Sequence, residues 1–243
     1  MYNEFAQVYD KLIKADVNYE HIADFIENLF IKYEKNPNLI CDLAAGTGNV
    51  TIPMARRGYD MIAVDSSYEM LDIAREKAEG KEILFLNQDL RKLDLFGTCD
   101  AFLCMIDGFN YITSKKALGD IFKRIRTCFI ENDGIFIFDI SSKHKLKNVL
   151  GNNIFIYDTD DLFYTWENKY KSGICKMELN FFLKNENNMF RRFEEVQIQR
   201  AYETQEIILL LKDAGFSSVD TYSGFEFKNI SESDERIVFV ALA

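Results

Sequence analysis

The stretch that decides the fold is ICDLAAGTGN, residues 40–49, followed by MIAVD at residues 61–65. Its pattern predicts a buried strand, a tight glycine turn, a short helix and a second strand that ends in a carboxylate. An α/β sheet holds the adenosine of a cofactor at the carboxyl ends of such strands. Small residues in the turn allow close approach of backbone to a ligand, and the N–H groups opening the next helix face it with a partial positive charge. Asp65 is placed to accept hydrogen bonds from both ribose hydroxyls.

The spacing of the glycines separates two classes of cofactor fold. A dinucleotide fold uses G-x-G-x-x-G, but here Gly46 and Gly48 are followed by Thr51 where the third glycine would stand. The alternative frame, Asp-x-Ala-x-Gly-x-Gly, is complete from Asp42 onward. It resembles motif I of the class I S-adenosylmethionine (SAM)-dependent methyltransferases, usually D/E-x-G-x-G-x-G, with Ala44 in place of the first glycine. The resemblance implies that Asp42 lies beside the ammonium and sulfonium end of SAM, where it would repel a pyrophosphate.

The resemblance to this family, in its small-molecule branch of methyltransferase domain 11 or 25 type, continues at later strand ends. Residues 83–90 look like the third strand, and Asp89, with Leu90 beside it, matches the family acid that contacts the adenine amino group. Residues 100–105 look like the fourth strand, and in the family the segment that follows it lines the junction of cofactor and acceptor. Motif I together with Asp65 and Asp89 in register is the most specific part of the match.

Two local patterns fix further elements. Residues 134–140 look like the fifth strand, entered through a turn at residues 132–134. Ser66-x-x-Glu69 reads as a capping box that opens the helix after the second strand. Near the carboxyl end, residues 204–242 fit the last helix and two strands of the family. The resemblance covers roughly residues 38–142 and 204–242.

The resemblance also implies the residues of the cofactor site. The segment around Phe5 and Tyr9 is similar to the opening of many small-molecule methyltransferases, where a helix forms a lid over the cofactor; covering the sheet is an equally good interpretation. We expect the cofactor, S-adenosyl-L-methionine, to be bound by Tyr9, Asp42, Ala44, Gly46, Gly48, Asp65, Ser66, Met70, Asp89, Leu90 and Met105.

The middle of the chain has a different pattern of residue types. Between about residues 150 and 200, aromatic and β-branched runs alternate with polar residues and turn signals, which predicts a meander of antiparallel strands. We therefore expect an α/β, Rossmann-like, doubly wound, seven-stranded and mostly parallel sheet of order 3-2-1-4-5-7-6 with an inserted antiparallel β cap. Residues 1–142 and 200–243 would form the SAM-binding core with an N-terminal helical lid, and residues 145–199 the cap that binds the acceptor.

Composition limits the partners. Of 243 residues, 48% are hydrophobic, and the formal net charge is −10, which disfavours binding to nucleic acid because that affinity rests largely on neutralising phosphates. The five cysteines form neither a C-x-x-C pair nor a Cys/His group of metal-ligand spacing, so we expect reduced thiols, no metal and a cytoplasmic location. Residues 2–10 do not resemble a signal peptide, and no apolar run reaches the length of a membrane span.

Few side chains are candidates for chemistry, because methyl transfer from a sulfonium mainly requires alignment and exclusion of water. An oxygen or protonated-amine acceptor also needs a base. His144, after the fifth strand, could be that base, although its surroundings also read as a solvated helix start, and Tyr111 is the second catalytic candidate. The candidates for binding the acceptor, which could equally be packing or capping residues, are Asp107, Asn110, Tyr164, Trp166 and Tyr202.

The leading hypothesis is therefore a SAM-dependent methyltransferase that methylates a nitrogen or oxygen of a small molecule. An RNA or protein acceptor is the alternative within that class. Outside it, an NAD-dependent oxidoreductase is disfavoured by the missing third glycine, and a SAM-binding protein without catalysis is disfavoured by the structured cap. A monomer and a homodimer are both compatible with the sequence.

Overall fold

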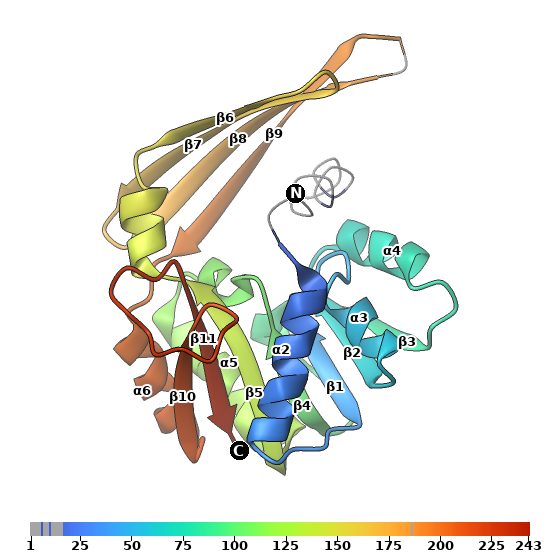
Figure 1. The fold of residues 1–243 in the computed structure, drawn as a ribbon, viewed down its shortest axis with the longest axis vertical. Helices are drawn as coiled ribbons and strands as arrows, with labels where there is room; N and C mark the ends of the chain where they lie inside the picture. The colour runs from blue at the N-terminus through green and yellow to red at the C-terminus, as the bar shows by residue number, and fades with distance from the viewer. Residues whose placement is uncertain (1–5, 7–9, 11–16, 186) are drawn as a thin grey trace.

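A seven-stranded sheet forms the core of the computed structural model, which describes residues 6, 10, 17–185 and 187–243 (Figure 1). Its strands are β1 (Leu39–Leu43), β2 (Asp60–Asp65), β3 (Ile83–Asn87), β4 (Cys99–Cys104), β5 (Ile130–Ser141), β10 (Ser218–Ser223) and β11 (Arg236–Leu242). Their order is β3-β2-β1-β4-β5-β11-β10, and β11 alone runs antiparallel to its neighbours. The predicted α/β class and mostly parallel sheet are confirmed. The numbers differ from the predicted 3-2-1-4-5-7-6 because four strands of a second sheet precede the last two core strands.

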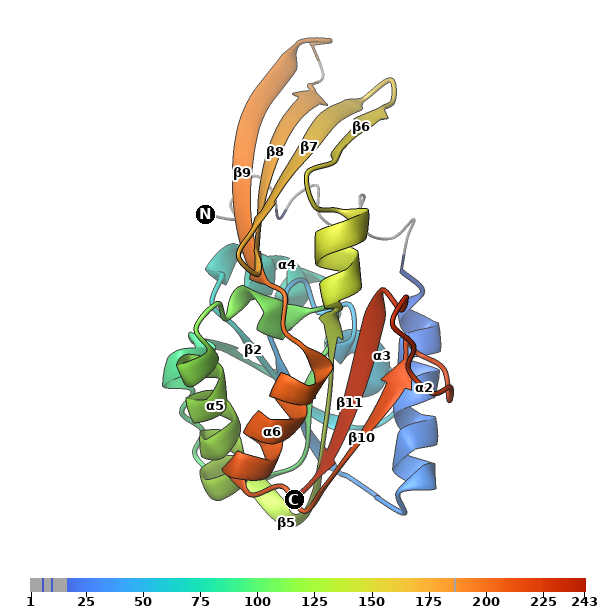
Figure 2. The same cartoon turned by 90° about the vertical axis from the view of Figure 1, so that its left-hand side faces the viewer.

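Helices cover both faces of this sheet (Figure 2). Side chains from α2 and α3 are buried against one face, and those from α5 and α6 against the other. The central strands are consequently buried on both sides, which explains why β1 and β4 are mostly apolar. The helices are α2 (Tyr19–Lys32), α3 (Thr51–Arg56), α4 (Tyr68–Lys77), α5 (Lys115–Arg124) and α6 (Thr204–Ala214), with short helical turns η1 (Leu90–Lys92), η2 (Gly108–Tyr111), η3 (Ile125–Phe129) and η4 (Lys145–Val149).

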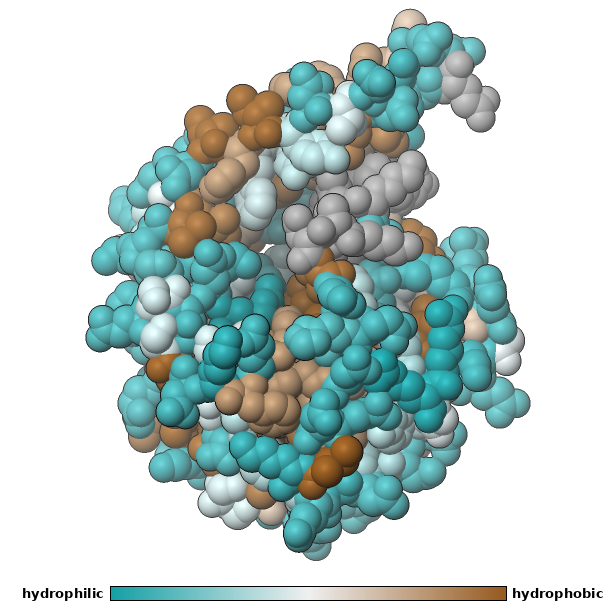
Figure 3. Space-filling view, in the orientation of Figure 1, coloured by the Kyte–Doolittle hydropathy of each residue, from teal (hydrophilic) through white to brown (hydrophobic). Residues whose placement is uncertain are grey.

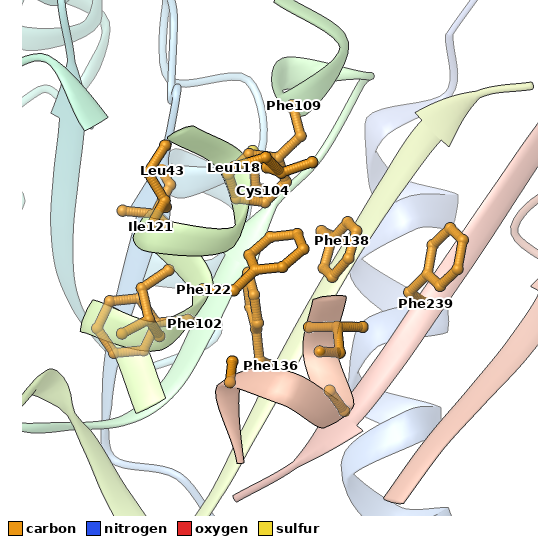
Figure 4. Close-up of a cluster of buried hydrophobic side chains, with 14 of the residues drawn as sticks. Leu43, Phe102, Cys104, Phe109, Leu118, Ile121, Phe122, Phe136, Phe138 and Phe239 are labelled. Carbon is orange, nitrogen blue, oxygen red and sulfur yellow. The ribbon is translucent and has the colours of Figure 1, made fainter. Parts of the chain in front are cut away.

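Aromatic rings fill the space under α5 and α6 (Figure 4). Phe109 meets Phe122 edge to face with ring centroids 5.2 Å apart, and Phe138 stacks on Phe239 at 5.1 Å. Each such pair contributes about 0.5–1.5 kcal/mol beyond burial of its area. Because Phe109 belongs to η2, this packing also fixes the segment that follows β4, where the site is built.

The second sheet stands above the carboxyl ends of the core strands (Figures 1 and 2). It contains β6 (Ile154–Asp158), β7 (Leu162–Lys171), β8 (Ile174–Lys184) and β9 (Phe190–Arg200), in that order and all antiparallel. The expected meander therefore forms. Apolar side chains gather at its upper left in Figure 3, where β6 and β7 lie; Ile154 and Ile156 of β6 are both exposed.

Two local predictions were wrong in detail. The helix α4 is capped by Ser67, whose side chain accepts from the N–H of Met70 at 3.2 Å, and not by Ser66. Residues 132–134 do not precede β5 but lie within it, where the pairing with β4 jumps from Ile130 opposite Cys99 to Ile135 opposite Ala101. The turn signal there marks an irregularity inside the strand.

Candidate functional site

The glycine turn after β1 has the tight geometry that its sequence predicts. Ala44, Gly46 and Gly48 all have positive φ, at 53°, 55° and 75°. A Cβ on Gly48 would stand 3.1 Å from the Cβ of Ala74 and 3.2 Å from Cδ1 of Ile52, so only glycine allows the turn to pack this closely on α4. The turn therefore presents backbone to a ligand without obstructing side chains.

Asp65, at the end of β2, is joined to this turn by backbone hydrogen bonds. Its carboxylate accepts from the N–H of Gly46 at 2.8 Å and from the N–H of Ser67 at 2.8 Å. Burial raises the pKa of Asp65, and these N–H donors partly oppose that rise. One carboxylate thus holds the turn and α4 together and keeps lone pairs for further donors.

Asp42, at the end of β1, is only 2% exposed. Its carboxylate accepts from the hydroxyl of Thr51 at 2.5 Å. Burial raises the pKa of Asp42 to about 7, although the Thr51 hydrogen bond acts in the opposite direction. The group is therefore balanced between its neutral and charged forms near neutral pH.

A cleft that is open to solvent on one side lies at the carboxyl ends of β1 and β4. The start of α2, the glycine turn and the segment after β4 surround it, through Tyr19, Asp42, Ala44, Ala45, Gly46, Thr47, Asn49, Val50, Met105 and Ile106. The predicted cofactor residues Asp42, Ala44, Gly46 and Met105 thus line one cleft.

The turn after β4 is strained and is held in place from the neighbouring strand. Ile106 and Asp107 have φ values of 61° and 54°, which are unfavourable for residues with a Cβ. Asp139 of β5 accepts from both of their N–H groups, at 2.6 Å and 3.0 Å. A Cβ on the next residue, Gly108, would lie 2.9 Å from the Cβ of Ala44, so this turn and the glycine turn approach each other closely.

Arg236 of β11 neutralises the carboxylates beside the turn after β4, and we call Arg236, Asp107 and Asp139 together the corner. Its guanidinium pairs with Asp139 and, at 3.1 Å, with Asp107. Although burial alone would raise the pKa of Asp107, the charge of Arg236 holds it below its usual value. Asp107 also accepts from Nε2 of Gln199 on β9 at 2.8 Å, so the core and the second sheet meet at this carboxylate.

Asp10 connects the amino-terminal part of the chain to the glycine turn. It accepts from Thr47 Oγ1 at 2.6 Å and from Asn49 Nδ2 at 2.9 Å. Lys77 Nζ donates to Asp10 at 2.7 Å and to the carbonyl of Thr47 at 2.8 Å. Tyr9, predicted to contact the cofactor, lies outside the described residues. Ala6, which is buried, and Asp10 are the residues of that motif that the structure describes.

At the predicted adenine end of the cofactor site, the carboxylate of Asp89 is already paired with Arg91. Asp89 accepts from the backbone N–H of Arg91 at 2.9 Å and pairs with its guanidinium, which lowers the pKa of Asp89. Leu90 is buried and Ser66 is exposed beside α4. Met70 is buried, packed in a cluster with side chains of the second sheet.

Several candidates for catalysis or acceptor binding lie outside the cleft. Asn110 is fully buried and bonds backbone groups: its amide donates to the carbonyls of Ser141 at 3.0 Å and Arg200 at 2.9 Å. Tyr202 is 1% exposed and donates to the carbonyl of Ile112. Asn110 thus ties η2 to the ends of β5 and β9, and Tyr202 ties the segment after β9 to the residue that follows η2.

The other candidates lie at the junction with the second sheet or within it. Tyr111 is 36% exposed and its hydroxyl lies 2.9 Å from Oε1 of Gln197 on β9. His144 is half-buried, with Nδ1 3.1 Å from the amide of Asn148. Tyr164 and Trp166 stand on β7. The predicted site residues did not include Asp10, Asp139, Gln199 or Arg236. Asp10 had a signal as the last residue of the amino-terminal motif, and Asp139 as an acid at a predicted strand end.

Neither a metal group nor a membrane helix occurs in the part of the chain that the structure describes. No three His, Cys, Asp or Glu side chains there are grouped to hold an ion. No helix among those residues is both long and apolar enough to cross a membrane.

Comparison with known proteins defines the class. Residues 40–130 match the family model described as a methyltransferase domain. The protein YqeM of Bacillus subtilis (strain 168), classed provisionally as a methyltransferase, is 31% identical over 99% of this chain and 96% of its own length. The crystal structure of a SAM-dependent methyltransferase from Clostridium acetobutylicum ATCC 824 is 35% identical, with a TM-score of 0.92 and coverage of 99% of this chain and 98% of that one.

A more distant structure shares the fold. SAM-bound CalS10, an amino pentose methyltransferase from Micromonospora echinaspora, superposes with a TM-score of 0.79 at 15% identity, covering 97% of this chain and 96% of that one. The matches to the Bacillus subtilis and Clostridium acetobutylicum proteins span nearly the whole chain. The chain therefore belongs to the class I SAM-dependent methyltransferases, and S-adenosylmethionine is its cofactor. This family membership displaces the oxidoreductase alternative.

Proposed function

We propose that the chain transfers the methyl group of SAM to a nitrogen or oxygen of a small molecule held between the core and the second sheet. The observation that carries this proposal is the position of the cleft. It lies at the carboxyl ends of β1 and β4, beneath a sheet that is tied to the same corner by the Gln199–Asp107 hydrogen bond. A molecule between the two sheets would face the cofactor cleft.

The cofactor side chains have separate tasks in this proposal. Asp65 accepts from the ribose hydroxyls, Asp42 faces the cationic end of the cofactor, and Asp89 receives the adenine amino group while keeping its pairing with Arg91. When bound, SAM supplies a methyl group on an excellent leaving group, so the protein's work is to align the nucleophile and exclude water. Asp42 in its ionised form favours a sulfonium over the uncharged thioether that remains after transfer.

Tyr111 and His144 are the proposed groups for proton transfer. Tyr111 follows the strained turn at Ile106 and Asp107 and touches β9, so it lies at the junction of core and second sheet. His144 precedes η4, which leads into the second sheet. Tyr111 is the stronger candidate of the two, because its hydroxyl lies 2.9 Å from Oε1 of Gln197 on the second sheet, where we propose that the methyl acceptor binds.

The charge of the chain favours a small molecule over RNA. A formal net charge of −10 opposes approach to a polyanion, whereas a neutral or cationic molecule meets no such barrier. A SAM-binding protein without catalysis would not need the strained turn and its buried Arg236 clamp beside the cleft.

The test is methyl transfer from SAM that carries a radiolabelled methyl group. Purified protein is incubated with pools of small amines and hydroxylated metabolites, with total RNA and with a protein extract. Label appearing in a small molecule, and falling by about tenfold or more with the Asp65→Ala variant at a subsaturating SAM concentration, is the expected result. Label in RNA or protein alone would overturn the small-molecule proposal, and absence of label from all three would favour the SAM-binding protein without catalysis.

A further inference from the structure

The inner face of the second sheet, which is turned toward the core, is built from ordered rows. Gln199 and Gln197 of β9 point to this face, because they bond Asp107 and Tyr111 of the core. Side chains alternate along a strand, so Glu195 shares that face. Strand pairing places Trp166, Leu179 and Glu195 in one row across β7, β8 and β9.

Three buried polar atoms on this face have no hydrogen-bond partner. They are Oε1 of Glu195, Nε1 of Trp166 and Oδ1 of Asn168, and they are the buried side-chain nitrogen and oxygen atoms in this condition within the described ranges. Asn168 stands two residues from Trp166 on β7, facing the same way. Leaving a polar atom buried and unpaired costs about 1–3 kcal/mol, and more for a charged one. Three such atoms in adjacent rows of one face are characteristic of a site that a ligand completes.

Glu195 is the most unusual of the three. It is 4% exposed, and burial raises its pKa to about 7. The row beside it is aromatic on all four strands, with Tyr157, Tyr164, Phe181 and Phe193 opposite one another. The rings of Phe181 and Phe193 stack at 4.9 Å and those of Tyr157 and Tyr164 at 5.2 Å. A carboxylate beside aromatic faces suits a protonated amine, which the anion and the rings both attract.

The remaining two atoms add a second requirement. Oδ1 of Asn168 needs a donor, which the same amine or a hydroxyl can supply, while Nε1 of Trp166 needs an acceptor. An oxygen near the amine satisfies Trp166. Adjacent rows lie about 7 Å apart and alternate strands about 10 Å apart, so the three groups frame an area the size of one sugar ring.

Resting on the proposed function, we propose that Glu195, Trp166 and Asn168 bind a protonated, hydroxylated amine of the acceptor, such as an amino sugar or amino alcohol. Glu195 lies four residues from Gln199, or about 13 Å along β9 from the residue that bonds Asp107. The bound amine is therefore remote from the transferred methyl. It contributes affinity and selects the substrate, and takes no part in the displacement.

The single tryptophan of the chain is Trp166, so its fluorescence reports this subsite alone. Protein saturated with S-adenosylhomocysteine is titrated at pH 8 with D-glucosamine, neamine and 2-amino-1,3-propanediol, and with the N-acetyl form of each. The matched control for Glu195→Gln is Glu194→Gln, because Glu194 is the adjacent carboxyl and already pairs with Arg192 on the exposed face.

We expect a saturable change in fluorescence with at least one free amine. The affinity should be at least tenfold weaker for the N-acetyl form of that amine, and at least tenfold weaker for the free amine in Glu195→Gln. In Glu194→Gln the affinity should be unchanged. No change with any amine, or an equal change in Glu195→Gln, would overturn the subsite. Calorimetric binding of S-adenosylhomocysteine is measured in parallel. If it persists while the amines fail, the subsite falls and the cofactor site stands; if it fails too, the proposed function falls.

Thermal unfolding without ligand gives an independent test. Glu195→Gln removes a buried carboxylate whose Oε1 has no hydrogen-bond partner, so its Tm at pH 8 should equal or exceed that of the parent protein. A Tm lower by several degrees would mean that Glu195 has a structural partner, and this would overturn the proposal.

Discussion

The cofactor edge of the core and the inner face of the second sheet treat their polar groups in opposite ways. At the core edge, Asp42, Asp65 and Asp139 all accept hydrogen bonds from the protein itself. On the second sheet, Oε1 of Glu195 and Nε1 of Trp166 are buried without hydrogen-bond partners among the described residues. The first arrangement holds backbone rigidly around a ligand of fixed shape. The second leaves buried polar atoms without hydrogen bonds, and in our proposal the methyl-accepting substrate supplies their partners.

The corner where the two regions meet gives the largest expected effect. Arg236→Met would leave Asp107 and Asp139 buried without their counter-charge, so we expect a loss of about 3–5 kcal/mol in the free energy of unfolding. Urea denaturation measures it. Arg192→Met is the control, since its pair with Glu194 is exposed and its loss should cost less than about 1 kcal/mol. Similar losses in both variants would contradict the role given to the corner.

Asp65→Ala tests the core edge itself. The variant removes a charged acceptor from the proposed ribose contacts and from the N–H of Gly46, so SAM affinity should fall by about 1.5–3 kcal/mol, roughly tenfold to 150-fold. Calorimetric titration with SAM provides the measurement. Asp60→Ala, at the opposite end of β2, should bind SAM like the parent protein. Unchanged affinity in folded Asp65→Ala would remove Asp65 from the cofactor site.

The charge of Asp42 predicts a pH dependence that distinguishes SAM from S-adenosylhomocysteine. A bound cation favours the ionised carboxylate, so the proton is released on binding and SAM affinity rises with pH up to the pKa of about 7. S-adenosylhomocysteine lacks the sulfonium and should gain less. The ratio of the two affinities should increase by up to about tenfold, or ~1.4 kcal/mol, between pH 5.5 and pH 8. A flat ratio, or the same rise in Asp42→Asn, would show that Asp42 does not sense the sulfonium.

The smallest effect separates two adjacent serines. Ser67→Ala removes the cap of α4 and should cost about 1 kcal/mol, while Ser66→Ala should leave stability unchanged because Ser66 is exposed and caps nothing. Thermal unfolding of both variants, without ligand, measures the difference. Equal Tm values would mean that the hydroxyl of Ser67 does not stabilise the helix.

Patterns close together in the sequence predicted the glycine turn and the adjacent strand ends, which the structure shows. The glycine turn, Asp42 and Asp65 are separated by few residues, so local spacing is enough to place them on adjacent strand ends. The cap of α4 was misplaced by one residue because Ser66 and Ser67 both fit a capping pattern. Residues 132–134 carry a turn signal, and tertiary pairing with β4 kept them inside β5.

The corner could not have been predicted in this way. Arg236 and Asp107 are 129 positions apart, and nothing near either residue indicates the other. Asn110, in the segment after the fourth strand, and Tyr202, as an aromatic ring that could hold a cation or a planar acceptor, were candidates for binding the acceptor. Their burial depends on distant contacts: Asn110 bonds backbone groups of two strands, and the Tyr202 hydroxyl bonds a carbonyl. The row of Trp166 and Glu195 depends on strand register, which composition does not specify.

The central claim is that the acceptor lies between the two sheets with its amine on Glu195. The most direct measurement is a crystal structure with S-adenosylhomocysteine and the hydroxylated amine that binds most tightly in the fluorescence titration. The account predicts the thioether in the cleft beside Asp42 and the amine within hydrogen-bonding distance of Glu195, with an oxygen near Nε1 of Trp166. An amine bound elsewhere, with Glu195 and Trp166 paired to protein groups, would contradict it.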